Sequence, residues 1–168
     1  MSSVALHPVR IRIAEPADAE ALTRLINAAF QVERFFIEGD RIDAEAVRKL
    51  MAAGQFLVGQ DVAQDDDGMC ACVYIEGRGD RAYLGLLSVH PSRQRSGLGS
   101  GLVAAAEEHA GASGIHCVDL RIVNLRQELP EFYRRLGYVV TGTSPFPPEV
   151  TTKQPCHFIN MSKALISA

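Results

Sequence analysis

The chain of 168 residues has the length of a single domain, since domains of about 100–200 residues are common. Hydrophobic residues make up 47% of the sequence and charged residues 22%, which excludes disorder as the dominant state. The net charge of −3 argues against a nucleic-acid-binding protein, and no apolar run reaches the ~20 residues that span a bilayer.

The N-terminal segment and the cysteines both indicate a cytoplasmic protein. Residues 1–12 lack the apolar segment of a secretory signal and carry charged side chains instead. The four cysteines, which do not have the spacing of metal ligands, are Cys70, Cys72, Cys117 and Cys156. We therefore expect reduced core cysteines, no bound metal, no membrane association and one domain over residues 1–168.

The first third of the chain predicts one strand followed by helical segments. Residues 9–14 alternate arginine with apolar side chains, as a strand with one solvated face does. Pro16 then begins a helix with an apolar stripe at helical spacing. A short helical or irregular piece at 33–36 precedes a helix over about 43–53, which ends at Gly54.

Three strand-like runs follow, at 56–62, 69–76 and 82–89. Turn residues join them, so an antiparallel meander is predicted. The first turn, at 64–68, is rich in aspartate. It does not place carboxylates at the ligand positions of a calcium-binding loop, so we interpret it as a solvated turn.

The remaining elements are a helix at 97–112, a strand at 116–123, a short helix at 130–136 and two strands at 138–143 and 157–162. Strand 82–89, the following helix and strand 116–123 are expected to form a parallel, right-handed unit. The proline-rich connection at 144–155 is too long for a tight hairpin, and we expect it to lie over a site.

The loop between strand 82–89 and helix 97–112 predicts a phosphate-binding site. Amide groups at the start of a helix have no partners within it, and the helix dipole adds positive potential there. Glycines allow a ligand to approach these amides closely, and Arg93 and Arg95 add charge. The same glycines, with Asp119 beyond them, also fit a loose dinucleotide fingerprint.

Position argues against the dinucleotide interpretation, which would make the protein a nucleotide-dependent oxidoreductase. A dinucleotide fingerprint opens directly after its strand, whereas about ten residues separate Val89 from Gly99. Asp119 also falls inside a strand rather than at its end.

A longer pattern resembles the acetyl-CoA signature of the GNAT superfamily of N-acetyltransferases, with Val89-x-Pro91-x-x-Gln94-x-x-Gly97-x-Gly99. The order of elements over nearly the whole chain is similar to the family's order. Asn124 and the segment 132–138 resemble a second family motif. The resemblance implies an α+β GNAT fold, with a mixed six- to seven-stranded sheet, splayed fourth and fifth strands, and helices on both faces.

The resemblance also implies acetyl-CoA as the acetyl donor. Amides of residues 95–100 are expected to hold its pyrophosphate, and the backbone of residues 87–89 its pantetheine arm. An amide near Leu87 is expected to face the thioester oxygen. The implied cofactor-binding residues are Leu87, Ser88, Val89, Gln94, Arg95, Ser96, Gly97, Leu98, Gly99, Ser100, Asn124 and Tyr133.

The expected reaction is direct attack of a primary amine on the thioester, with Tyr133 giving a proton to the leaving thiolate. Some family members carry a glutamate base on the fourth strand, but Gly85 stands at that position here. The base therefore stays open between Glu33, His157 and a chain of waters.

The acceptor pocket is expected to use five aromatic side chains, Phe30, Phe35, Phe36, Tyr83 and Phe146. No acidic stripe favours a polycationic acceptor, which leaves small amines, amino acids and peptide N-termini. Homodimers are common in the superfamily, and the residues do not decide that point. A non-catalytic module that binds CoA or acyl-CoA is the alternative function.

Overall fold

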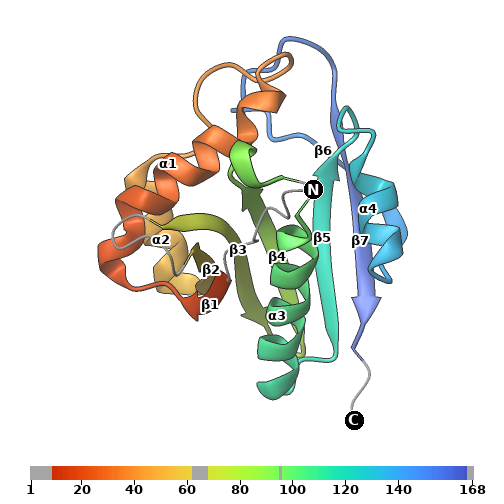
Figure 1. Ribbon diagram of the computed structural model, residues 1–168. Helices are drawn as coiled ribbons and strands as arrows, with labels where there is room; N and C mark the ends of the chain where they lie inside the picture. The colour runs from red at the N-terminus through yellow and green to blue at the C-terminus, as the bar shows by residue number, and fades with distance from the viewer. Residues whose placement is uncertain (1–8, 62–67, 95, 166–168) are drawn as a thin grey trace, which may run out of the picture.

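The structure, a computed structural model, describes residues 9–61, 68–94 and 96–165. In these residues seven strands form one mixed sheet in the order β1-β2-β3-β4-β5-β7-β6 (Figure 1). The strands are β1 (Val9–Ile13), β2 (Gln55–Asp61), β3 (Met69–Arg78), β4 (Arg81–Val89), β5 (Cys117–Val123), β6 (Val139–Pro145) and β7 (His157–Ala164). The α-helices are α1 (Ala19–Ala29), α2 (Ala44–Ala53), α3 (Leu98–Ala112) and α4 (Leu129–Arg135). None of the helices in the described ranges is both long and apolar enough to cross a membrane.

The sheet confirms the predicted antiparallel meander of β2, β3 and β4 and the parallel pairing of β4 with β5. Strands β1 to β4 pair antiparallel in chain order, β4 pairs parallel with β5, and β7 lies antiparallel between β5 and β6. The β4–β5 pairing is short, because it joins only 81–83 to 117–119. Beyond these residues the two strands separate, which confirms the splayed pair. The aspartate-rich turn predicted at 64–68 lies, except for Gly68, outside the described residues.

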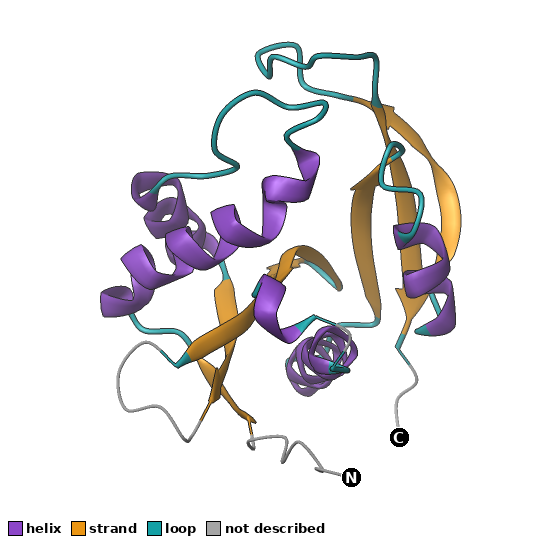
Figure 2. Ribbon diagram, turned by 45° about the horizontal axis from the view of Figure 1, so that its top comes forward, coloured by secondary structure: helices purple, strands orange, loops and turns teal. Residues whose placement is uncertain are grey.

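Helices cover both faces of the sheet, as expected (Figure 2). The alternation along β3 assigns the faces: Val73 packs in the core under α3 and α4, while Cys72 and Tyr74 pack under α1 and α2. Successive side chains of a strand point to opposite faces, so one strand serves both cores. All four cysteines are free, and Cys70 is buried like Cys72.

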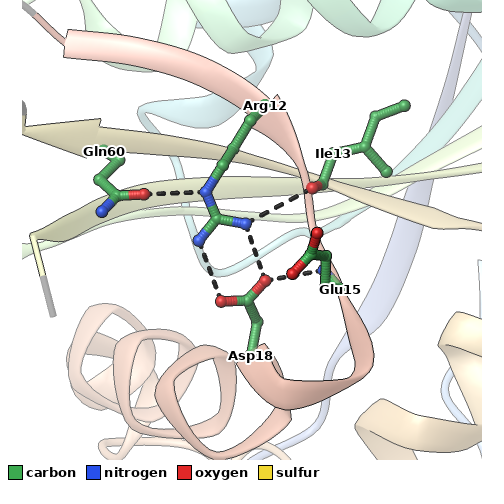
Figure 3. A network of polar contacts seen from close by, with 5 residues as sticks. All are labelled: Arg12, Ile13, Glu15, Asp18 and Gln60. Carbon is green, nitrogen blue, oxygen red and sulfur yellow. Dashed lines mark hydrogen bonds and ion pairs between the residues drawn. The ribbon is translucent and has the colours of Figure 1, made fainter. Parts of the chain in front are cut away.

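A polar network fixes the start of α1 against the first two strands (Figure 3). The Arg12 guanidinium donates to both carboxylate oxygens of Asp18, at 2.8 and 2.9 Å, and its Nε donates to Gln60 at 2.8 Å. Asp18 also accepts the Glu15 amide at 2.7 Å. Arg12 lowers the pKa of Asp18, so this carboxylate stabilises the fold above its unfolded pKa of 3.8 and loses that contribution as the pH falls.

Candidate active site

A cavity of about 650 Å³ lies where β4 and β5 separate. It is lined by residues 83–87 of β4 and 120–123 of β5, together with the segment after α1 and Tyr133 of α4. Residues 146–151, from the β6–β7 connection, complete the lining. This connection crosses the segment after α1, where Ile37 pairs with Thr152, so it lies over the site as predicted.

Strand β4 has a bulge at the cavity wall. Cys72 of β3 pairs with Ser88, but Tyr74, two residues on, pairs with Gly85, so β4 contains one extra residue. Leu86 lies in this bulge with a φ of +52°, in the left-handed region that residues other than glycine rarely adopt. The bulge interrupts pairing with β3, and the other edge of β4 is free after 83. The Leu86 carbonyl accepts from the Ser88 hydroxyl at 2.9 Å, and in the described part of the sheet Leu87 has no partner in the register of either neighbouring strand.

The bulge was not predicted, although Gly85 was its sequence signal, since a glycine inside a strand often marks one. The structure also explains why residue 85 is glycine. A Cβ at this position would lie 2.9 Å from the Tyr83 ring and its hydroxyl. The aromatic ring of Tyr83 therefore occupies the space into which a glutamate side chain at position 85 would project.

The loop that the sequence predicts to bind phosphate leads into α3 through Gly97, whose φ is +82°. A Cβ at Gly97 would meet nothing within 4 Å, so the space over the first amides of α3 is open. The Ser96 hydroxyl donates to the Arg93 carbonyl at 2.5 Å, and the Gln94 side chain reaches the Val89 carbonyl at 3.4 Å. The loop therefore fits an anion at the helix N-terminus. Arg95, expected to bind the cofactor, lies outside the described residues.

Arg93, which the sequence suggested as a charge beside the phosphate, forms an ion pair that anchors this loop to β2. Its guanidinium donates to the Asp61 carboxylate of β2 at 2.7 Å, and the Asp61 side chain is only 3% exposed. We expect Asp61→Asn to lower the free energy of unfolding by about 1–3 kcal/mol, because a buried charge-assisted contact is weakened. Urea unfolding measures this loss, and calorimetry should find weaker acetyl-CoA binding.

The matched control for Asp61→Asn is Asp40→Asn. Asp40 pairs with Arg34 at 2.9 Å, but both side chains are more than half exposed. Exposed pairs contribute about 0–1 kcal/mol, so this variant should unfold almost like the wild type. Equal losses in the two variants would contradict an anchoring role for Asp61.

Tyr133 lies on the cavity wall with its side chain 5% exposed. Its ring packs edge-on against Phe132 and Tyr138, at centroid distances of 4.9 and 5.7 Å. Within the part of the chain that the structure describes, the Tyr133 hydroxyl makes no hydrogen bond. Burial raises the pKa of Tyr133, so the phenol stays protonated and is able to donate its proton.

Glu33 lies on the same cavity and is buried, although its sequence context favours a solvated helix charge. Its carboxylate accepts from Arg126 at 2.9 Å, and Arg126 also donates to Glu128 at 2.7 Å. Burial raises the pKa of Glu33, and the charges of Arg126 and Arg41 only partly oppose that shift. Sequence reasoning missed Arg126, which follows β5 in a loop without a recognisable motif.

Asn124 forms two hydrogen bonds with the backbone of His157. The Asn124 side chain accepts the His157 amide at 2.8 Å, and the Asn124 amide donates to the His157 carbonyl at 3.0 Å. Asn124 thus ties the end of β5 to the start of β7, and its side-chain oxygen is occupied. The His157 side chain is exposed and does not line the cavity.

Three of the five predicted aromatic residues line the cavity, namely Phe30, Tyr83 and Phe146. The other two do not: Phe36 is fully buried and Phe35 is 51% exposed, and they pack on each other. Phe158 was missed; it lines the cavity and stacks on Phe146 at 4.6 Å. Acidic side chains that the sequence does not group, Glu38, Asp40 and Glu149, also reach the cavity.

Asp119 does not serve the dinucleotide interpretation. Its carboxylate accepts from Arg81 at 2.7 Å and from the Ser162 hydroxyl. It lies on the face of the sheet beside the short parallel pairing, away from the start of α3. These contacts occupy both carboxylate oxygens, so Asp119 has a structural role in joining β4, β5 and β7.

Residues 52–140, more than half of the chain, match the acetyltransferase (GNAT) domain family. No curated protein sequence matches the chain at a significant level. The ribosomal-protein-S18-alanine N-acetyltransferase from Escherichia coli is a similar solved structure, with a TM-score of 0.75, 18% identity and 96% coverage of each chain. The yncA structure from Salmonella typhimurium, with its cofactor acetyl-CoA, has a TM-score of 0.73, 20% identity and 95% coverage of each chain.

Ard1 from Thermoplasma volcanium is similar too, with a TM-score of 0.74, 18% identity, and coverage of 95% of this chain and 99% of that one. At sequence identities this low, the structural similarity shows a shared fold and nothing more. The family match includes strand β4, the loop at Gly97 and Tyr133. Signature, fold and family match agree, and the chain belongs to the GNAT acetyltransferase family.

Proposed function

We propose that the protein transfers an acetyl group from acetyl-CoA to a primary amine of a small molecule or a peptide. The observation that carries this proposal is the cavity between β4 and β5, whose wall contains Tyr133 and Leu87. Leu87 also borders the first turn of α3, since a Cβ at Gly99 would lie 3.8 Å from its side chain. The proposal treats residues 1–168 as one domain that acts in the cytoplasm, where its four free cysteines stay reduced.

The chain's residues fit the cofactor at three places. Amides of residues 96–100 at the start of α3 bind the pyrophosphate, and the free edge of β4 at 87–89 binds the pantetheine arm. The amide of Leu87, beside the bulge, orients the acyl oxygen and stabilises negative charge there. Acetyl-CoA, when bound, supplies the acetyl group.

Two side chains handle protons in this proposal. Tyr133 donates its phenolic proton to the departing thiolate. The raised pKa of Tyr133 keeps the phenol protonated until the thiolate forms. Glu33 accepts the proton of the amine, directly or through one water, and Arg126 holds the carboxylate in place. His157 lies outside the cavity lining, so we assign the base to Glu33.

Glu33→Gln should lower kcat/KM for the amine about tenfold or more at neutral pH, because a general base typically contributes 10²–10⁴-fold and water replaces part of it. Since the pKa of Glu33 is raised, the wild-type rate should fall as the pH drops through a value above 4.5. The variant should lose that limb of its pH–rate profile, measured by thiol release.

Glu128→Gln is the control for Glu33→Gln. Glu128 also bonds to Arg126, but its side chain is 61% exposed and lies outside the cavity lining. This variant should keep both the rate and the acidic limb. Loss of the limb in Glu128→Gln, or its survival in Glu33→Gln, would remove Glu33 from the reaction.

The proposed function is tested by ligand binding and turnover. Thermal unfolding is measured with acetyl-CoA, CoA or NAD(P)H. The free energy of unfolding should rise only with the CoA species, by about 2.7 kcal/mol at a ligand concentration 100 times the dissociation constant. Mass spectrometry should then detect an acetylated product in a panel of amines. Binding without turnover would favour the CoA-binding module, and a shift with NAD(P)H alone would favour an oxidoreductase.

A further inference from the structure

A second hollow, of about 730 Å³, adjoins the cavity on the side of the sheet that carries α1 and α2. The two spaces share Arg41, Tyr83, Leu86, Leu120 and Arg121 in their walls. In β5, Leu120 packs in the core under α3, so Arg121 points to the opposite face and into these spaces. A ligand in the cavity therefore has room to extend over β5 and β7.

The arginines around this hollow differ in their partners. Arg78 pairs with Glu76, and Arg81 pairs with Asp119, the hollow's acidic residue. Arg121, in contrast, has no carboxylate partner among the residues that the structure describes. Its recorded contacts are the rings of Phe158 and Tyr83, at 4.4 and 5.9 Å. Arg41, which lines both spaces, also forms no ion pair with a carboxylate in the described residues; it lies over the Phe30 ring at 5.5 Å. The hollow therefore has two arginines, Arg41 and Arg121, whose charges are not neutralised by a carboxylate in contact.

Stacking on rings leaves the edge of a guanidinium free to donate. The planar N–H groups of arginine match a carboxylate bidentately, and aromatic rings hold the plane in a fixed orientation. Asn160 faces Arg121 directly in the β5–β7 register and also lines the hollow. Its Oδ1 accepts from Ser144 at 3.2 Å, which leaves its NH2 group able to donate to a ligand.

We propose that the acceptor is an amine that also carries a carboxylate, and that Arg121 with Asn160 binds that carboxylate. This inference rests on the proposed acetyl transfer to amines. The amine end lies toward Tyr133 and Glu33 in the cavity, and the anionic end lies in the hollow. Glu38 and Glu149 line the cavity and not the hollow. Their negative charges attract an amine and repel a carboxylate, which favours this orientation over the reverse.

The test compares free amino acids with their carboxamides, which lack the negative charge. The probes are the twenty L-amino acids, β-alanine and γ-aminobutyrate. Wild-type protein should prefer at least one carboxylate over its amide by about tenfold to a hundredfold in kcat/KM, as charge-assisted bonds do. Arg121→Gln should abolish that preference mainly through KM, and Arg121→Lys should retain part of it.

Arg78→Gln is the matched control. Arg78 also stacks on the Tyr83 ring, at 4.6 Å, but Glu76 already neutralises it. This variant should keep the wild-type ratio. Turnover without a carboxylate preference, or an Arg121→Gln ratio equal to that of wild type, would overturn the inference and leave the proposed function intact.

A binding measurement separates the two failures. CoA-saturated protein is titrated calorimetrically with the N-acetylated forms of the same amino acids and amides. If no amine is turned over, the proposed function fails, and this titration decides the anion site by itself. Tighter binding of the acids than of the amides, absent in Arg121→Gln, supports the site. Equal binding of acids and amides, or no binding of either, overturns it.

Discussion

Gly97→Glu should abolish measurable acetyl-CoA binding, with a dissociation constant at least about a hundredfold higher, or ~2.7 kcal/mol. Two effects add. A carboxylate at Gly97 would lie in the open space over the first amides of α3, where it repels a phosphate. The φ of +82° also disfavours any side chain by about 1–2 kcal/mol. Isothermal titration with acetyl-CoA measures the loss.

Gly114→Glu is a matched control for both the charge and the backbone strain. Gly114 follows the other end of α3 with a φ of +83°, and a Cβ there would also meet nothing within 4 Å. At a helical rise of about 1.5 Å per residue, the 15 residues of α3 separate the two glycines by roughly 22 Å. The variants should therefore lose similar stability, but only Gly97→Glu should lose acetyl-CoA. Equal affinities would place the pyrophosphate elsewhere.

Tyr133→Phe should lower kcat by about 10²–10³-fold, within the range for loss of a general acid. The KM for acetyl-CoA should stay within about twofold, since the ring keeps its packing and only a proton donor disappears. The midpoint of thermal unfolding should not fall, because the hydroxyl makes no hydrogen bond within the described ranges. Steady-state kinetics and calorimetry measure these three quantities.

Tyr138→Phe should give the opposite result. The Tyr138 ring packs on Tyr133, and its hydroxyl donates to Glu107 at 3.1 Å. Removing that bond should cost about 1 kcal/mol of stability, while kcat stays unchanged. A similar fall of kcat in both variants would mean that Tyr133 acts through packing rather than as an acid.

The predicted elements agree with the structure because their signals are local. Apolar periodicity gives helix or strand within a window of the chain, and Pro16 and Gly54 mark boundaries through their backbone preferences. The signature at Gly97 is local too, since one loop and the start of one helix make up the proposed phosphate site. For these features a short sequence contains the whole cause.

The composition of the cavity wall was predicted only in part. Phe35 and Phe36 are adjacent aromatics near the correct segment, yet one is exposed and one is core. Their orientation depends on the turn after α1 and on the connection that crosses it at Ile37. Arg126 and Arg121 gave no signal, because an arginine's role depends on which groups from distant segments face it.

The sequence by itself determined the order of helices and strands along the chain, and it predicted the loop proposed for an anion and the proposed acid at Tyr133. Only the tertiary structure decided that β4 bulges at Leu86, that Glu33 is buried against Arg126, and that Arg121 has no carboxylate partner among the described residues. The physical reason is range. Backbone preferences and periodicity act between near neighbours, whereas burial and charge pairing join residues that only the folded sheet brings together.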